Sequence, residues 1–167
     1  MNSIEEIVQK LKLLPHPEGG FFKETYRSEG TILKSSLAEV FKSKRNYCTG
    51  IYYLLKSNDF SAFHKINQDE MWHFYIGSPI ELHMISENGV LSTVKIGNDI
   101  LNDEVLQFVV PKNYWFAAKV VNSDSYSLVG CTVAPGFDFK DFTLASRKDL
   151  SEKFPQHSAI IKAFTRQ

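Results

Sequence analysis

The sequence predicts an all-β domain of the double-sheet jelly-roll type, with short helices at both ends. Between residues 47 and 133, short runs rich in β-branched and aromatic residues are separated by Asn, Asp, Gly, Pro and Ser, which is typical of a sandwich or barrel. The flanking segments instead carry apolar residues at helical spacing. The 167 residues contain no repeat and no linker, so we expect a single domain over 1–167.

The first expected element is a short amphipathic helix in an N-terminal arm over about 3–14. Ser3 and Glu6 fit a capping box at its start, and Pro15 should follow its end. Its apolar stripe consists of Ile4, Ile7, Val8 and Leu11.

The barrel should occupy about 20–143. Gly19 and Gly20 turn the chain into an extended segment over 21–27, and a loop with a helical turn around residues 37–41 comes next. The strands predicted after this loop cover 47–55, 61–66, 71–76, 80–86, 90–96, 105–110, 114–121 and 126–133.

C-terminal helices are expected over about 146–165. Ser146 and Asp149 form a capping pair, and Pro155 interrupts the chain before a last helix at 157–164.

The charge pattern excludes several classes of partner. Nineteen Lys and Arg residues balance nineteen Asp and Glu residues, so we expect no nucleic-acid partner and no membrane association. The first residues lack the pattern of a secretory signal, which indicates a cytoplasmic protein. Cys48 and Cys131 stand apart in strand-like sequence, so we expect two buried, reduced thiols rather than a disulfide.

The strongest functional signal lies in residues 64–77, where His64, Glu70 and His73 stand among aromatic and β-branched residues. Imidazole and carboxylate groups bind metals and transfer protons near neutral pH, and burying them without a purpose is costly. The segment therefore predicts a binding or catalytic site.

Strand alternation assigns the side chains of this segment to two faces. The set expected on the inner faces of the two strands consists of His64, Ile66, Glu70, Trp72 and Phe74. The set expected on the opposite face, unless a bulge intervenes, consists of His73 and Tyr75.

The spacing resembles the first motif of the cupin superfamily, with His64, Glu70 and Gly77 at the first histidine, the glutamate and the closing glycine. The resemblance implies a site with four metal ligands. Two of those four positions hold apolar side chains in this chain, Ile66 and Phe116.

Three flanking motifs make the resemblance more specific. They are PHPEGG at 15–20, ETYRS at 24–28 and APGFDF at 134–139. With them, the chain from about 11 to 154 resembles the small single-domain cupins often called the fifth cupin family. The resemblance implies the cupin double-stranded β-helix, a jelly-roll barrel, and a homodimer, because the superfamily commonly pairs barrels. It does not supply a reaction.

Metal binding requires three or more protein ligands, with water completing the shell. His64 and Glu70 supply two, and they are only weak metal candidates. A third would have to come from His73, on the opposite face, or from His83. We therefore expect no metal and no other cofactor, with a weak or adventitious metal site as the alternative.

Without a metal, His64 beside Glu70 suits general acid–base catalysis, with the carboxylate fixing the tautomer and raising the basicity of the imidazole. Tyr53 is the candidate for the opposing acid, and the alternative is a core aromatic with its hydroxyl at the rim. The arrangement is similar to that of the metal-free sugar-nucleotide epimerases of the cupin superfamily, which is an analogy of fold.

We expect a barrel pocket that binds a small polar molecule, such as a sugar or sugar nucleotide, and the leading enzymatic hypothesis is an epimerase or isomerase. The alternatives are a non-catalytic small-molecule binding protein and a metal-dependent lyase or oxygenase. The residues expected to contact the ligand are Trp72, His73, Tyr75, Phe116, Glu24, Tyr26 and Arg27.

Two of these groups have a structural alternative. Glu24 and Arg27 suit a pocket mouth that binds a polar or anionic ligand, or else a structural ion pair. The alternating phenylalanines in 135–142 predict a strap over the barrel, in which Asp138 and Asp141 cap or turn the chain.

Overall fold

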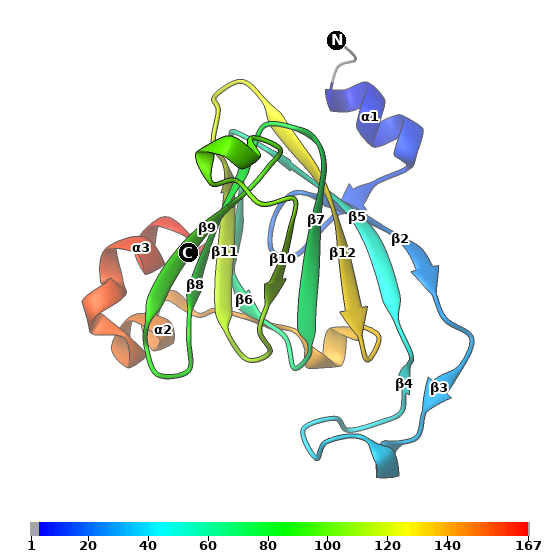
Figure 1. The fold of residues 1–167 in the computed structure, drawn as a ribbon. Coiled ribbons are helices and arrows are strands. Elements are labelled where there is room, and N and C mark those ends of the chain that lie inside the picture. Colours follow the sequence, from blue (N-terminus) through cyan, green and yellow to red (C-terminus); the bar gives the residue numbers. More distant parts are fainter. Residues whose placement is uncertain (1–3, 167) are drawn as a thin grey trace.

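The computed structural model describes residues 4–166, so the capping box predicted at Ser3 lies outside the described residues. Two antiparallel sheets face each other, and the helices lie outside them (Figure 1). The six-stranded sheet contains, in spatial order, β1 (Leu14–Pro15), β2 (Phe21–Arg27), β5 (Thr49–Lys56), β12 (Tyr126–Ala134), β7 (Asp69–Gly77) and β10 (Gln107–Val110).

The second sheet has five strands. They are β13 (Thr143–Leu144), β6 (Phe60–Lys65), β11 (Trp115–Val120), β8 (Ile80–Ile85) and β9 (Leu91–Ile96). The chain between β2 and β5 forms a separate arm with β3 (Thr31–Ile32) and β4 (Arg45–Asn46), which projects from the body of the molecule (Figure 1).

The alternation of apolar and polar residues predicted the strands of the barrel well. Each of the eight predicted strands is present, with ends that differ by at most two residues. The sequence prediction missed β1, β3, β4 and β13. Each of these has only two residues, which is too short for a period of two to be visible.

The core lies between the two sheets and is built from the inward residues of both. Tyr53, Trp72 and Phe116 are its largest members, and each is at most 1% exposed. As the alternation predicts, Glu70 and Trp72 are buried on β7 whereas Met71 between them is exposed.

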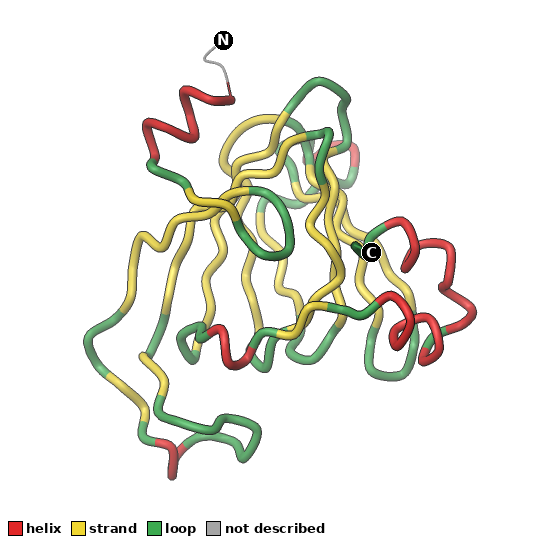
Figure 2. The backbone as a smooth tube through the Cα atoms, turned by 180° about the vertical axis from the view of Figure 1, so that it is seen from behind, coloured by secondary structure: helices red, strands yellow, loops and turns green. Residues whose placement is uncertain are grey.

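Helices cover the outer faces of the sheets, and Figure 2 shows the N-terminal and C-terminal helices on opposite sides of the strands. Helix α1 (Ile4–Leu11) packs through residues including Ile7 and Leu11 against a buried cluster of Leu13, Leu54 and Leu128 on the six-stranded sheet. Helices α2 (Arg147–Lys153) and α3 (Ser158–Ala163) pack on the five-stranded sheet through a cluster of Phe63, Ile85, Ala117, Leu150, Phe154, Ile161 and Phe164.

Two helical predictions hold with small differences. The turn expected around residues 37–41 is present as a single turn in which the Phe41 N–H donates to Ala38 O at 3.1 Å, and a 3₁₀ turn, η1 (Lys34–Ser36), precedes it. The last helix, α3, matches its predicted bounds to within one residue at each end, and Pro155 begins a 3₁₀ turn, η4 (Pro155–His157), before it. The Ser146 cap is present, with its hydroxyl oxygen accepting the Asp149 N–H at 3.3 Å.

Both thiols are free, and their burial differs. Cys131 is buried, but Cys48 is only half-buried, which corrects the prediction for Cys48. No helix in the described part of the chain is both long and apolar enough to span a membrane.

A buried ion pair fastens the β3–β4 arm to the C-terminal part of the barrel. The Arg45 guanidinium donates two hydrogen bonds to the Asp141 carboxylate, at 2.7 and 2.6 Å, and both side chains are 2% exposed. Gln68 Nε2 donates to the same carboxylate at 2.8 Å. Asp141 precedes β13, and η3 (Phe139–Asp141) carries it, so this pair connects segments 96 residues apart.

We expect Asp141→Asn to lower the free energy of unfolding by about 3–5 kcal/mol, because the substitution leaves the Arg45 charge buried without its counter-ion. Urea denaturation measures the change. Glu152→Gln is the matched control, since Glu152 forms an exposed pair with Lys148 and should have little effect. An equally small loss in both variants would contradict this role for the Arg45–Asp141 pair.

Candidate functional site

A cavity of about 320 Å³ is lined by both sheets, by the N-terminal arm and by residues of the 137–142 segment. Its polar part contains Glu18, His64 and Glu70, all of which are at least nine-tenths buried. Aromatic and aliphatic side chains form much of the remaining wall.

The N-terminal arm continues past its helix to residue 20, and a tight turn at its end carries Glu18 into the cavity. Gly19 and Gly20 have φ angles of 118° and 69°, a region that residues with a Cβ rarely adopt. A Cβ on Gly19 would also collide with the Phe60 carbonyl. The Ala62 N–H donates to Glu18 O at 2.8 Å, which fixes the arm against β6.

Glu18 and His64 form a buried ion pair. His64 Nε2 lies 3.0 Å from Glu18 Oε2, and Ser61 Oγ donates to Glu18 Oε1 at 2.9 Å. On the other side of the ring, His64 Nδ1 lies 2.8 Å from the Ala62 carbonyl oxygen. Because both ring nitrogens face acceptors, both carry protons, and His64 is an imidazolium.

The electrostatics of the pair agree with this geometry. Burial alone would raise the pKa of Glu18, but the charge of His64, then that of His16 in its protonated form, and hydrogen bonds from His64 and Ser61 lower it to about 2. Burial alone would lower the pKa of His64, but the charge and hydrogen bond of Glu18 raise it. The predicted direct partner of His64, Glu70, is therefore replaced by Glu18, which the arm brings into hydrogen-bond contact.

A β-bulge places Ser61 and His64 on the same side of β6. Opposite β11, His64 pairs with Phe116 and Ser61 pairs with Ala118, so β6 contains one extra residue in this stretch. Without the bulge, the two side chains would point to opposite faces, and Glu18 would have only one of them as a donor.

His16 is a second histidine in the cavity, and it is neutral. The Glu18 N–H donates to His16 Nδ1 at 3.3 Å, and burial lowers the pKa of His16. Nδ1 is thus an acceptor, and the proton is on Nε2. The ring packs against Phe22 and Phe142, with centroids 4.7 and 5.9 Å away. Within residues 4–166, Nε2 has no hydrogen-bond partner.

Glu70 is the other buried carboxyl group of the cavity. Burial raises its pKa, the charge of His64 opposes the rise and the charge of Glu18 adds to it, and the resulting pKa is about 7. A group with such a pKa both accepts and donates protons near neutral pH. Burial and the charge of Glu70 raise the pKa of the neighbouring Cys131 thiol well above its usual range, so this thiol is protonated.

Tyr53 and Trp72 complete the polar part of the cavity. The Tyr53 hydroxyl donates to Gly19 O at 2.9 Å, and burial raises the pKa of Tyr53, which keeps the phenol neutral. Trp72 Nε1 is buried without a hydrogen-bond partner in the described part of the chain. The Glu70 carboxyl lies close enough to this N–H for a weak hydrogen-bond interaction, which slightly lowers the pKa of Glu70.

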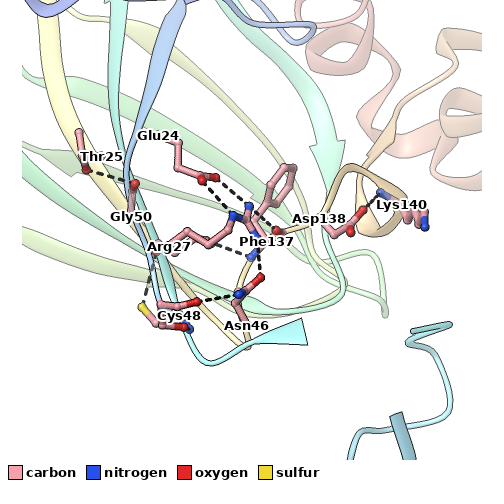
Figure 3. A network of polar contacts seen from close by, with 12 residues as sticks. Glu24, Thr25, Arg27, Asn46, Cys48, Gly50, Phe137, Asp138 and Lys140 are labelled. Carbon is pink, nitrogen blue, oxygen red and sulfur yellow. Dashed lines mark hydrogen bonds and ion pairs between the residues drawn. The ribbon is translucent and has the colours of Figure 1, made fainter. Parts of the chain in front are cut away.

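At another part of the cavity wall, Arg27 connects three segments of the chain (Figure 3). Its Nε and Nη2 donate to the two carboxylate oxygens of Glu24 at 2.9 and 2.7 Å. Nη1 donates to Asn46 Oδ1 at 2.9 Å and Nη2 to Phe137 O at 3.0 Å. A register shift between Glu24 and Tyr26 in β2 lets residues of opposite parity meet in this ion pair.

Residues 137–142, here called the strap, cross the cavity wall with three phenylalanines. Phe137, Phe139 and Phe142 all line the cavity, and Phe139 is 50% exposed. Asp138 caps η3, because its Oδ1 accepts the Lys140 N–H at 2.9 Å. The predicted strap is therefore present, with Asp138 as a cap.

The structure places His73 and Tyr75 outside the cavity. His73 lies on the outer face of β7, where its ring nitrogens contact Thr132 Oγ1 and Gln107 Nε2, both at 3.0 Å. Tyr75 is 47% exposed and packs edge-on against Tyr52. Strand alternation assigns both residues to the face opposite Glu70, and this assignment is correct. Neither residue lines the cavity, which corrects the expectation that they contact its ligand.

Tyr26 and Phe116 do not line the cavity either. Tyr26 is 57% exposed on β2. Phe116 is 1% exposed and packs against the His64 ring, with centroids 4.0 Å apart, so it supports the histidine from the core. Of the predicted residues, the cavity brings together His64, Glu70, Tyr53, Trp72, Glu24 and Arg27.

The residues do not fit the four-ligand metal site that the cupin resemblance implies. Ile66 and Phe116 offer no donor atoms, and His64 Nε2 is directed at Glu18. His83 lies outside the cavity, with Nδ1 3.0 Å from Thr93 Oγ1. Among the described residues, no group of three or more His, Cys, Asp or Glu side chains is arranged to hold a metal ion.

His16 and Glu18 were not among the predicted site residues, although their segment, PHPEGG, is one of the motifs that carry the family resemblance. A histidine and a glutamate two residues apart, enclosed by prolines and glycines, carry more chemistry than a turn requires. The sequence therefore offered a reason to predict these two residues as part of a site. It could not show that they lie beside His64, because that depends on how the N-terminal arm docks on β6.

Both a family model and a curated relative match most of this chain. A family described as Cupin superfamily (DUF985) matches residues 5–145. An uncharacterized protein of Saccharomyces cerevisiae, YML079W, is 31% identical over 157 residues, which cover 89% of this chain and 78% of the yeast protein.

Solved structures give the same picture. Protein SO0799 from Shewanella oneidensis is 38% identical with a TM-score of 0.89, and the match covers 99% of each chain. A hypothetical protein from Leishmania major is 32% identical with a TM-score of 0.90, covering 99% of this chain and 100% of the other. Oxalate decarboxylase from Bacillus subtilis is 11% identical, with a TM-score of 0.55 over 90% of this chain and 36% of that one, a likeness of fold alone.

We expect the ring of His64 to be doubly protonated at pH 7.5, because both of its nitrogens donate to acceptors. Nitrogen-15 NMR of histidine-labelled protein measures this, with His64→Asn for assignment. His16 is an internal control, since it should be neutral at the same pH. Glu18→Gln should lower the pKa of His64. A neutral His64 in the unmodified protein would contradict the ion pair.

We expect Glu70→Gln to stabilise the protein above pH 8 and to have little effect at pH 5. The folded-state pKa of Glu70 is about 7 against an ordinary value of 4.5 in the unfolded chain, so its contribution to stability is present below pH 4.5 and is lost as the pH rises through 7. A shift of this size corresponds to about 3 kcal/mol. Urea denaturation from pH 5 to pH 9 tests the difference, with exposed Glu87→Gln as the control. A pH-independent effect of Glu70→Gln would contradict the assignment.

Proposed function

The chain belongs to the fifth cupin family, and we propose that its cavity binds a small, polar, carbohydrate-like molecule and acts on it as a metal-independent isomerase or epimerase. The observation that carries the proposal is the buried Glu70 carboxyl, with a pKa of about 7, in the same cavity as the His64–Glu18 ion pair. A protonatable group beside a fixed, oriented charge is the arrangement that proton transfer at carbon requires.

Glu70 is the general base of this proposal. In its ionised form it removes a proton from the carbon next to a carbonyl group, so that a C–H bond breaks and a carboxyl O–H bond forms. The electron pair moves into the carbonyl and gives an enolate. Return of the proton to the other face, or to the neighbouring carbon, gives the epimer or the isomer. No oxidant, reductant or metal is needed for this sequence.

His64 has a different role from the base that the sequence suggested. Both of its nitrogens are engaged, with Glu18 and with the Ala62 carbonyl, so it has no free nitrogen to accept a proton. Its positive charge instead stabilises the enolate electrostatically. Glu18 is a positioning residue that keeps His64 protonated.

Tyr53 remains the candidate for the opposing acid. Its hydroxyl is neutral and lines the cavity, and it now donates to Gly19 O. To protonate a substrate, the hydroxyl would have to exchange this hydrogen bond for one to the ligand.

The size of the cavity favours a ligand of monosaccharide size, because about 320 Å³ is near the lower end of the range for small-molecule pockets. A sugar nucleotide would leave much of its nucleotide outside. Cytoplasmic location and dimeric assembly are parts of the same proposal that rest on the sequence pattern and on the family.

Deuterium exchange tests the proposal directly. Keto and aldo sugars, free and as sugar nucleotides, are incubated with the protein in D₂O, and proton NMR follows loss of the signal at the carbon next to the carbonyl. We expect exchange without added metal and in the presence of a chelator, with a rate that rises with pH through about 7. Glu70→Gln should lower the rate by on the order of 10²–10⁴-fold.

Glu87→Gln, on an exposed turn, should exchange like the unmodified protein. Binding of a sugar without exchange would replace the proposal by a non-catalytic binding protein. Exchange that requires a metal, or that survives Glu70→Gln, would overturn the mechanism.

A further inference from the structure

The cations in the cavity wall are already fully engaged. Arg27 donates to Glu24 through two parallel hydrogen bonds and uses its remaining contacts on Asn46 and Phe137 (Figure 3). His64 donates to Glu18 and to a backbone carbonyl. Neither is available to a phosphate or carboxylate of a ligand unless an existing ion pair is broken. Of the two alternatives for Glu24 and Arg27, the structure contains the structural ion pair.

Two carboxyl groups in the wall, in contrast, have no cation paired with them. Within residues 4–166, neither Glu70 nor Asp138 forms an ion pair, although both line the cavity. The charge of Asp138 acts on Arg27 and Arg45 from a distance, and these arginines are neutralised by their own carboxylates. The cavity wall thus carries the negative charge of Asp138, to which Glu70 adds when it is ionised.

Asp138 has one oxygen free for a ligand. Its Oδ1 accepts the Lys140 N–H, and Oδ2 has no hydrogen bond among the described residues (Figure 3). Lys140 is exposed and does not line the cavity.

Aromatic rings surround this region. The Phe139 ring contacts the rings of Phe137, Phe22 and Phe142, with centroids 5.0, 6.4 and 6.0 Å apart. The faces of aromatic rings attract ammonium groups, and several rings beside a carboxylate form a recurring site for amines. Phe139 is 50% exposed, so this end of the cavity is open to an entering ligand.

The polar part of the cavity favours a second property of the ligand, an oxygen atom that accepts a hydrogen bond. Trp72 is 1% exposed and lines the cavity, and its indole N–H makes no hydrogen bond of normal geometry among the described residues, with only a weak interaction toward the Glu70 carboxyl. A buried donor without an acceptor costs free energy, so a ligand oxygen at this place is favoured. The ligand should therefore present an oxygen to Trp72 and a cation to the strap.

We propose that the molecule bound in this cavity carries a protonated amine, which lies among the phenylalanine rings of the strap with its charge directed at Asp138. This inference rests on the proposed function in taking the cavity as the substrate site. It makes the substrate an amino sugar, in preference to a phosphorylated or acidic one.

The test compares probes of equal size that differ in charge. Cyclohexylammonium, cyclohexanol and cyclohexanecarboxylate form one series, and glucosamine, glucose and glucuronate the other. Titrations at about pH 6.5, where the amines are cationic and the acids ionised, are followed by NMR of backbone amides and give dissociation constants. We expect the amine to bind on the order of 10-fold or more tightly than the carboxylate, and more tightly than the neutral probe, with shifts in strap amides.

Asp138→Asn removes the charge and keeps the η3 cap, because asparagine is an equally good N-cap residue. It should reduce the preference for the amine several-fold and leave binding of the neutral probe unchanged. Asp103→Asn is the matched control at an exposed position and should change neither. Equal or tighter binding of the carboxylates, an amine preference that persists in Asp138→Asn, or no binding of any amine at millimolar concentration would overturn the inference.

The cyclohexyl series separates this inference from the proposed function. Amine preference without deuterium exchange would support the amine site and remove the isomerase. Exchange on neutral or acidic sugars without amine preference would support the isomerase and remove the amine site.

Discussion

The buried ion pair between Glu18 and His64 is the interaction on which the rest of the site depends. It joins the N-terminal arm to the barrel and closes one side of the cavity with a carboxylate that no strand supplies. Burying either charge alone would cost several kcal/mol, so each residue requires the other. Ser61 donates a hydrogen bond to Glu18, and His64 donates one to the Ala62 carbonyl. These bonds satisfy the remaining polar atoms of the pair and help to offset the cost of burying its charges.

The same ion pair influences the pKa of the Glu70 carboxyl group. A lone buried carboxyl group is neutral, and one beside an uncompensated cation is ionised. Glu70 experiences the positive charge of His64 and the negative charge of Glu18 together, and these largely offset each other, so burial remains the main influence on its pKa. The value of about 7 therefore depends on the arm being docked. A displaced arm would leave His64 facing Glu70 alone, and the pKa of that carboxyl would fall.

The sequence predicted the barrel because its main strands alternate over four to nine residues, and it predicted the inward positions of His64, Glu70 and Trp72 by the same rule. It failed where the structure departs from simple alternation. A bulge in β6 turns Ser61 inward, and a register shift in β2 brings Glu24 and Arg27 together. Such one-residue irregularities reverse the parity of everything beyond them, and nothing in the composition of these strands marks them.

The other failure concerns distance along the chain. Glu18 and His64 are 46 positions apart, and the contact between them follows from a two-glycine turn and a hydrogen bond from β6 to the arm. Pattern reasoning finds the turn but not the surface on which it docks. For the same reason, the sequence left open whether Arg27 binds an anion or forms a structural ion pair. Its hydrogen bonds to Glu24, Asn46 and Phe137 depend on three segments that meet only in the folded chain. Packing of segments that are distant in the sequence determines which charged side chains in the cavity remain unpaired. The unpaired charges in turn determine which chemical class of ligand the cavity favours.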